Sequence, residues 1–337
     1  MSTSPTAAAT DSTGRRQQSV ALAQNLVAIL TWSLAPTMVR AVTVSFPVNF
    51  QNACRYITAL LVLWPVYLLS ARRDRPKMRS DLRQLLSRAP RILIIALAAY
   101  GFQVCYTYSL FLITPSLQAL VGQVQVLFAV VFAVLLFPDE RALIGGWRFL
   151  VGVTAALGGV GLVIVGGRAF GSVQFGIGVL VVVASTLCWA LLGSLLRAWV
   201  PDLPAQMTVS AVFTVVSPAF VVTYAIAHHG LPIPTAPLTH WLLLVSSGLV
   251  AIGLGHSMFY RAVPVLGVSV STSLGLLLPF GVSLVSFVAL GETLTPMQLA
   301  GGVILLAGSF LVIRARFHAP PPRAPRAPGA GAANRAP

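Results

Sequence analysis

Long runs of apolar residues, separated by short polar breaks, fill the chain from residue 19 to residue 315. A helix needs about 20 apolar residues to cross the hydrocarbon core of a bilayer. Ten runs have this length, and proline, glycine or charge marks most of the junctions between them. The pattern predicts an all-α polytopic membrane protein. Its predicted spans are 19–40, 47–70, 91–113, 115–138, 144–166, 174–199, 205–228, 239–262, 265–290 and 294–315.

The two ends of the chain lack such runs. Residues 1–18 are polar and rich in Ser, Thr and Ala, whereas residues 316–337 are rich in Ala, Pro and Arg. Because neither composition can bury a core, we expect both ends to be disordered and cytosolic. The first apolar run is longer than the roughly 7–15 residues of a signal-peptide core, which indicates a retained first span.

Several residues return in the second half of the chain in the same order. The segment Trp32-Ser33-Leu34, followed by Arg40, has a counterpart in Trp189-Ala190-Leu191, followed by Arg197. At a fixed offset of 152 residues the matches are Gly101 with Gly253, Tyr108 with Tyr260, Phe128 with Phe280, and Glu140 with Glu292. Together these echoes predict two repeats, over 19–167 and 174–315. Five spans per repeat is an odd number, so the second repeat must be inverted relative to the first.

Composition agrees with a membrane protein, and the placement of charge gives its orientation. The chain is 57% hydrophobic and 9% charged, with a mean hydropathy of +0.87, whereas a soluble domain carries roughly 25% charged residues. The net charge of +15 does not indicate a nucleic-acid partner, because most cations lie in short loops and tails. All but three of the 22 cations fall on one predicted face, eight of them in the loop 71–91. This bias predicts cytosolic N- and C-termini and a multi-pass protein of the cell membrane.

The chain resembles the drug/metabolite transporter superfamily, specifically the group with two EamA-type repeats. The resemblance covers residues 20–315 and rests on the two five-span halves and on three further features. These are a tryptophan near the start of spans 1 and 6, the arginine in Ala53-Cys54-Arg55-Tyr56, and the acids closing span 4 (Asp139-Glu140) and span 9 (Glu292).

The resemblance implies a transporter, often an exporter, of small metabolites such as amino acids, nucleosides or amphipathic drugs. The family often has a proline midway along both span 4 and span 9. Here span 9 has Pro279, but the matching position in span 4 is Leu127. We therefore expect the two halves to kink differently.

Acidic residues are missing from the cores of all the predicted spans, since all seven lie in tails, loops or span ends. Proton-coupled carriers usually keep a carboxylate at membrane depth. Coupling would therefore use another group, or the substrate would equilibrate passively. His256 is the candidate for proton coupling or substrate contact, because an unshifted histidine titrates near pH 6.5. The alternative role for His256 is an interhelical hydrogen bond.

Arg55 is the one cation predicted deep within a span, about 12 Å below its outer end at 1.5 Å per residue. A charge at that depth costs several kcal/mol unless it is paired. Arg55 could snorkel to a lipid phosphate, pair with Glu292, or capture the carboxylate of a substrate.

Further polar and aromatic residues recur at helical spacing within the spans. Gln118 and Gln125 share one face of span 4 with Gly122, and Tyr100 and Gln103 share one face of span 3. These faces either line a cavity or join helices. The repeat-related tryptophans could stack an aromatic or cationic substrate, or pack the core. The predicted cavity residues are Trp32, Arg55, Tyr100, Gln103, Gln118, Gln125, Trp189 and His256.

The remaining motifs narrow the class of protein. Glycines crowd spans 5 and 10 and predict close packing, either between spans or between the protomers of a homodimer. No GxxxxGKS, HExxH or GxSxG motif occurs, and we expect no cofactor and no metal. A membrane-embedded enzyme is disfavoured, because the adjacent His256 and Ser257 diverge by about 100° on a helix. A carrier of a small molecule is the favoured function, and a passive channel-like facilitator of the same fold is the alternative.

Overall fold

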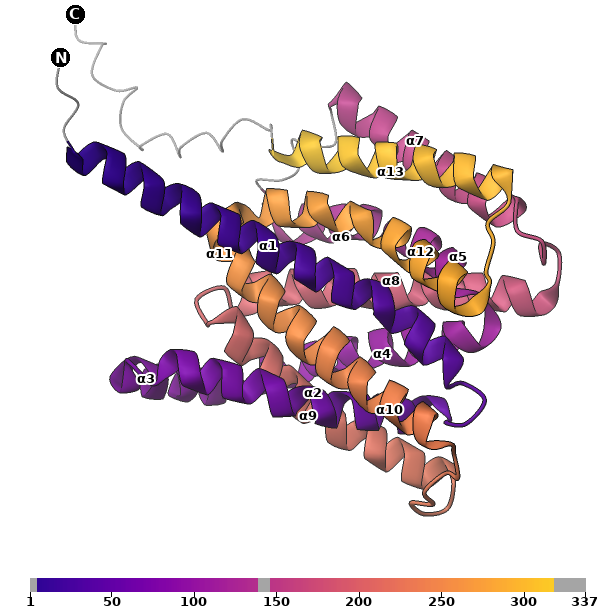
Figure 1. The fold of residues 1–337 in the computed structure, drawn as a ribbon, viewed down its shortest axis with the longest axis horizontal. Helices are drawn as coiled ribbons and strands as arrows, with labels where there is room; N and C mark the ends of the chain where they lie inside the picture. The colour runs from indigo at the N-terminus through magenta and orange to yellow at the C-terminus, as the bar shows by residue number, and fades with distance from the viewer. Residues whose placement is uncertain (1–4, 139–145, 318–337) are drawn as a thin grey trace, which may run out of the picture.

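The computed structural model describes residues 5–138 and 146–317, which form helices joined by short loops (Figure 1). Ten helical segments in this part of the chain are long and apolar enough to cross a membrane, as predicted. The spans of the first half are α1 (Pro5–Ala41), α2 (Val48–Ala71), α4 (Ala89–Leu112), α5 with η1 and α6 (Pro115–Val121, Gly122–Val124, Gln125–Leu136) and α7 (Trp147–Val165).

The second half repeats this order upside down. Its spans are α8 (Val173–Trp199), α9 (Ala205–Ala227), α10 with η3 and the first part of α11 (Leu238–Ser246, Ser247–Leu254, Gly255–Leu274), the last part of α11 with η4 and α12 (Gly275–Leu277, Leu278–Leu290), and α13 (Pro296–Phe317). The additional helix α3 (Arg75–Ser87) lies in the arginine-rich loop between spans 2 and 3. Both the start of α1 and the end of α13 lie at the same end of the bundle as α3 (Figure 1).

Helix α1 begins earlier than predicted. The segment 1–18 was expected to be disordered, but the chain is helical from Pro5 onward. Proline is favoured at the first position of a helix, and alanine, which dominates the next residues, has the highest helix propensity. Residues 1–4 and the tail from 318 onward lie outside the described part of the chain, as do the span-closing acids Asp139 and Glu140.

The boundary between spans 8 and 9 also differs from the prediction. It was expected around residues 262–265, but α11 continues through Pro264 and its backbone leaves the helical conformation at Gly267, where φ is 79° and ψ is 158°. This positive φ is readily adopted only by glycine. Glycine, rather than proline, therefore separates the two spans.

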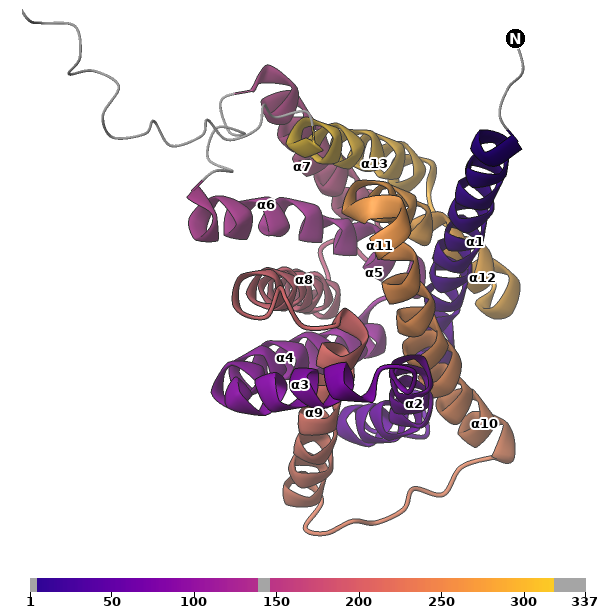
Figure 2. The same ribbon diagram turned by 90° about the vertical axis from the view of Figure 1, so that its left-hand side faces the viewer.

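The two halves pack against each other helix by helix. Helix α1 contacts α11 and α12 of the second half, and its repeat mate α8 contacts α4 and α6 of the first half. The repeat-related pairs α2 with α9 and α7 with α13 contact each other directly. Exchanging the halves therefore maps each of these contacts onto another of the same kind, which is the signature of a pseudo-two-fold axis. Figure 2 shows the bundle along its length, with α8 between α4 and α6.

Spans 4 and 9 are interrupted at corresponding places. A 3₁₀ turn begins at Gly122 in span 4 and at Gly275 in span 9. We expected the two halves to kink differently because only span 9 has a proline, Pro279, yet a 3₁₀ turn interrupts both spans. Pro279 lies in the first turn of α12, where proline fits a helix. In both halves the interruption begins at a glycine.

At the end of the bundle that holds α3, an ion pair links the two halves. The Nη2 atom of Arg88 donates to Oδ2 of Asp202, in the loop between α8 and α9, at 2.6 Å. This hydrogen bond holds the pKa of Asp202 below its ordinary value. Because both groups are exposed to solvent, the pair contributes little to stability.

Glycines hold α7 and α13 in direct backbone contact. We call Gly152, Gly159, Gly301 and Gly308 the glycine seam. A Cβ atom on Gly159 would lie 2.4 Å from the Leu305 nitrogen, and one on Gly152 would lie 2.9 Å from the Gly308 oxygen. Of the glycines predicted to pack either spans or protomers, these four therefore pack two spans of one chain.

This seam predicts a sharp contrast between two adjacent glycines. Gly159→Ala places a methyl group against the backbone of α13 and should destabilise the protein by about 1–3 kcal/mol, the usual cost of overpacking. The matched control is Gly158→Ala, because a Cβ atom at Gly158 meets nothing within 4 Å. Thermal unfolding of both variants in detergent measures the difference. Equal unfolding temperatures would contradict the close α7–α13 contact.

Candidate functional site

Arg55 is buried within the protein rather than directed at lipid. Its side chain, on α2, is 2% exposed. The Nε and Nη1 atoms are buried and have no hydrogen-bond partner among the described residues. The guanidinium lies within electrostatic range of the phenol groups of Tyr106 and Tyr56. The snorkelling alternative is therefore wrong, because a side chain this buried does not reach the membrane surface.

Glu292 does not pair with Arg55 either. Its Oε2 atom accepts hydrogen bonds from the backbone nitrogen of Ser116 at 3.2 Å, from the Ser116 hydroxyl at 2.8 Å, and from the Ser286 hydroxyl. These bonds fix the carboxylate at the start of α5, whereas α2 packs on α9 and η3. The predicted Arg55–Glu292 ion pair is absent from the described structure, because packing places the two residues in different regions of the bundle.

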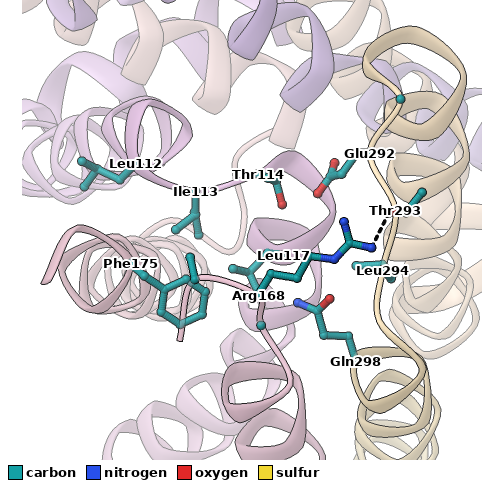
Figure 3. A pocket seen from close by; sticks show the side chains of 13 residues that line it. Leu112, Ile113, Thr114, Leu117, Arg168, Phe175, Glu292, Thr293, Leu294 and Gln298 are labelled. Carbon is teal, nitrogen blue, oxygen red and sulfur yellow. Dashed lines mark hydrogen bonds between the residues drawn. The ribbon is translucent and has the colours of Figure 1, made fainter. Parts of the chain in front are cut away.

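Glu292 instead borders a pocket of about 300 Å³ at the end of the bundle opposite α3. The pocket lies where the loops after α4, α7 and α12 converge, and Figure 3 shows Arg168 extending into it. The Nη2 atom of Arg168 donates to the Thr293 hydroxyl at 3.0 Å, which joins the loops of the two halves. No sequence pattern groups Arg168 with Glu292, because 124 positions separate them.

Gln103 lies at the centre of a buried polar network between α2 and α4. Its Nε2 atom donates to Oδ1 of Asn52 at 3.1 Å and to the Thr107 hydroxyl at 3.0 Å. Its Oε1 atom accepts from the Tyr56 hydroxyl at 3.2 Å, and the Thr107 hydroxyl donates to Oδ1 of Asn52 at 2.6 Å. Each amide group of Gln103 therefore has a partner, so the network ties α2 to α4.

His256 and Trp32 meet across the two halves. Their ring centroids lie 5.3 Å apart in an edge-to-face arrangement, and His256 also contacts Phe213 at 5.5 Å and Tyr260 at 6.1 Å. The Nδ1 atom of His256 pairs with the Ile252 carbonyl oxygen at 2.9 Å, so Nδ1 carries the proton. Its Nε2 atom is left as the ring nitrogen available to a ligand. The Trp32 Nε1 atom is buried without a partner.

Trp189 does not contact Trp32, its repeat mate. It packs on Phe102 of α4, with ring centroids 4.7 Å apart, and Phe102 in turn contacts Tyr106. Each tryptophan thus lies against the opposite half, Trp32 on α11 and Trp189 on α4. The structure therefore gives each tryptophan its own aromatic neighbours, and stacking of an aromatic or cationic substrate on either ring stays a prediction.

Of the other predicted residues, Tyr100 and Gln118 contact other buried residues of the site, and the Gln125 side chain makes no hydrogen bond within the described part of the chain. Tyr100 stacks on Phe220 of α9 at 4.9 Å, and Gln118 donates to the Tyr106 carbonyl at 2.9 Å and to the Ser109 hydroxyl at 3.0 Å. Gln125 is half-buried, and no hydrogen bond joins its side chain to a described residue. Beside it, Gly122 borders open space, because an added Cβ atom there would meet nothing within 4 Å.

Seven of the eight predicted residues belong to one continuous region. Contacts run from Trp32 through His256 to Phe213, which packs on Tyr56 at 4.6 Å, and Tyr56 bonds Gln103. Arg55, Gln118 and Trp189 join this region through Tyr106 or Phe102, and Tyr100 joins through Phe220. Gln125 remains outside it.

Sequence reasoning missed four polar members of this region, namely Asn52, Tyr56, Tyr106 and Gln206. Asn52 lies one helical turn before Arg55, and this spacing could have identified it. Gln206, at the start of α9, donates to the Ser257 hydroxyl at 3.1 Å and to the Leu63 carbonyl at 3.2 Å.

The two glutamines Gln103 and Gln125 should respond differently to replacement by leucine. Gln103→Leu leaves the Tyr56 hydroxyl without its partner and removes one of the two donors to Oδ1 of Asn52, and we expect a loss of about 1–3 kcal/mol in unfolding free energy. Gln125→Leu removes no hydrogen bond of the described structure and should leave stability unchanged. Thermal unfolding in detergent compares the two variants. A Gln125→Leu variant as unstable as Gln103→Leu would refute the distinction.

Ten spans in two inverted halves that share a polar interior define a membrane transporter of the inverted-repeat class. The profile of the EamA-like transporter family matches residues 19–165 and again residues 176–314. The chain therefore belongs to the EamA-like transporter family, within the drug/metabolite transporter superfamily.

A solved crystal structure has the same fold. It superposes with a TM-score of 0.58, at 19% sequence identity, over 89% of this chain and 98% of the other. At this identity the likeness extends to the fold alone. None of the curated proteins compared with the chain matches it.

Proposed function

We propose that the protein is a secondary transporter that exports a small organic metabolite across the cell membrane by alternating access. The observation that carries this proposal is the crossed packing of α1 on α11 and α12, mirrored by α8 on α4 and α6. Because the two sets of contacts are equivalent under the pseudo-two-fold axis, a conformation closed at one end has a counterpart closed at the other. Membership of a transporter family supports the same class of function.

The substrate site of this proposal is the region that connects Arg55, Gln103, Trp189 and His256. Its side chains come from both halves, so movement of one half relative to the other changes the site. Aromatic rings from α1, α4, α8, α9 and α11 supply its walls, and the buried amides supply fixed hydrogen-bond donors and acceptors. An apolar site with a few polar groups is typical of small-molecule recognition. The substrate would be a small organic molecule such as an amino acid, a nucleoside or an amphipathic compound.

A passive facilitator is the second candidate, and one observation favours it. None of the seven acids of the sequence lies in a span core, so the usual carboxylate for proton coupling is missing. The fold would then exchange substrate down its own gradient.

Flux into proteoliposomes separates these possibilities. We expect the purified protein to accelerate uptake of at least one labelled metabolite, with counterflow when the unlabelled compound is trapped inside. An imposed pH gradient should drive accumulation if the carrier is proton-coupled, and should have no effect on a facilitator. The absence of flux for amino acids, nucleosides, organic acids and amines would refute the transport proposal.

Proton coupling, where it occurs, would use His256. Glutamine preserves hydrogen-bonding capacity but cannot take up a proton, so His256→Gln should remove the pH dependence of flux while flux itself persists. His240→Gln is the control, because His240 lies in the first turn of α10 and its Nδ1 atom is 2.6 Å from the hydroxyl of Ser45, in the loop between α1 and α2. A His256→Gln variant with unchanged pH dependence would leave His256 a packing role.

The orientation of the protein is part of the same proposal. The arginine-rich segment around α3 supports placing this end of the bundle, with both chain ends, in the cytosol. A cysteine introduced into the C-terminal tail should react with a membrane-impermeant maleimide only after the membrane is opened. Labelling of intact cells would refute this orientation.

A further inference from the structure

The feature that points beyond a generic carrier is the unpartnered guanidinium of Arg55. Arginine stays protonated in proteins, so burial cannot neutralise it. A buried charge without a partner costs several kcal/mol, and proteins keep such a charge only where something compensates it. Here two of its nitrogens, Nε and Nη1, are buried without a partner, and no described carboxylate lies within ion-pair distance.

The backbone around Arg55 is held in place, so a loose helix does not explain why the guanidinium lacks a partner. Gly248 of the π-helical segment η3 packs so closely that a Cβ atom there would lie 2.5 Å from the Arg55 carbonyl oxygen and 2.8 Å from its Cα atom. Asn52, one turn earlier on α2, is fixed by Gln103 and Thr107. Arg55 is thus a rigidly mounted cation between α2 of one half and η3 of the other. π-Helical segments occur often at functional sites.

We propose that Arg55 binds the carboxylate of the transported substrate, and that the substrate class is small monocarboxylates with an apolar or aromatic body. This inference rests on the transport function proposed above. One guanidinium neutralises one negative charge, which favours a monoanion over a dianion such as phosphate. The rings of Tyr56 and Tyr106, which lie near Arg55, and of Phe102, which contacts Tyr106, suit an apolar or aromatic body. An ammonium group would find no carboxylate partner in the described span cores, which disfavours amines.

Three probes of the same size and different charge test the proposal, namely phenylacetate, phenylacetamide and 2-phenylethylamine. Binding is followed by thermal shift in a nonionic detergent, and flux by counterflow in phosphatidylcholine vesicles that contain no anionic lipid. The choice of lipid separates a free carboxylate from a lipid phosphate as the occupant. We expect wild-type protein to bind and exchange phenylacetate in preference to the amide and the amine.

The variants are Arg55→Gln and Arg55→Lys, with Arg40→Gln as the control. Arg40 already donates to the Leu110 carbonyl at 2.6 Å, so its guanidinium is not free for a ligand. Arg55→Gln should weaken phenylacetate binding about 10- to 100-fold, the usual value of a charge-assisted hydrogen bond, and Arg55→Lys should weaken it less. Arg40→Gln should leave the preference for phenylacetate unchanged. Because an unpaired buried charge is unfavourable, empty Arg55→Gln protein should unfold at the same or a higher temperature than wild type.

Each other result overturns a definite part of this account. One such result is that wild-type protein transports the amide or the amine as well as phenylacetate and that Arg55→Gln leaves this flux unchanged. It would refute the anion site but keep the carrier. Arg55-dependent binding of phenylacetate without counterflow would refute the carrier and keep the anion site. An empty Arg55→Gln protein that unfolds at a lower temperature and shows no change in selectivity would make Arg55 structural. Failure of phenylacetate to stabilise the wild-type protein at millimolar concentration would also refute the monocarboxylate class.

Discussion

The architecture depends on close contact between helices of opposite halves. In lipid, apolar side chains gain little by leaving the membrane for a helix interface, so association relies on fit and hydrogen bonds. The fit here comes from glycines of the second half that pack directly against the first half. Gly248 packs against α2, Gly255 against Trp32, and Gly281 against Ser33. These contacts bring together the elements that form the candidate site. Neither half can form the site alone, because each supplies only part of it.

The buried polar residues of this interior are of two kinds, those whose hydrogen-bonding groups are satisfied within the protein and those whose groups are not. The Gln103 network satisfies its donors and acceptors internally, so it costs little and rigidifies α2 against α4. Arg55 is three residues from Asn52 in the same helix, yet two of its nitrogens stay unpartnered. The rigid Gln103 network thus lies beside an unpartnered guanidinium. This arrangement is expected of a preorganised binding group, because the protein need not rearrange when a ligand binds.

The spans and their inversion were predictable, whereas the contacts of single side chains were not. A 20-residue apolar run can be read from one segment alone. Because each half has an odd number of spans, the second half must enter the membrane in the opposite direction. The partner of Arg55 depends on which helix lies opposite, and so the Arg55–Glu292 pair was predicted wrongly. Similarly, helical spacing placed Gln118 and Gln125 on one face, but only packing shows that Gln118 is bonded and Gln125 is not. The break at Gly267 was missed because Pro264 is the stronger local signal, although its backbone angle still fits the helix.

The glycine seam between α7 and α13 has a mechanical consequence. These helices are repeat mates, so the pseudo-two-fold axis passes between them, and the axis maps the seam onto itself. When the open end of the bundle changes, the contacts of α1 and those of α8 must take each other's geometry. The seam is symmetric about the axis, so its contacts can stay the same in both conformations. It is therefore suited, like the self-paired contact between α2 and α9, to stay in place while the other six spans move.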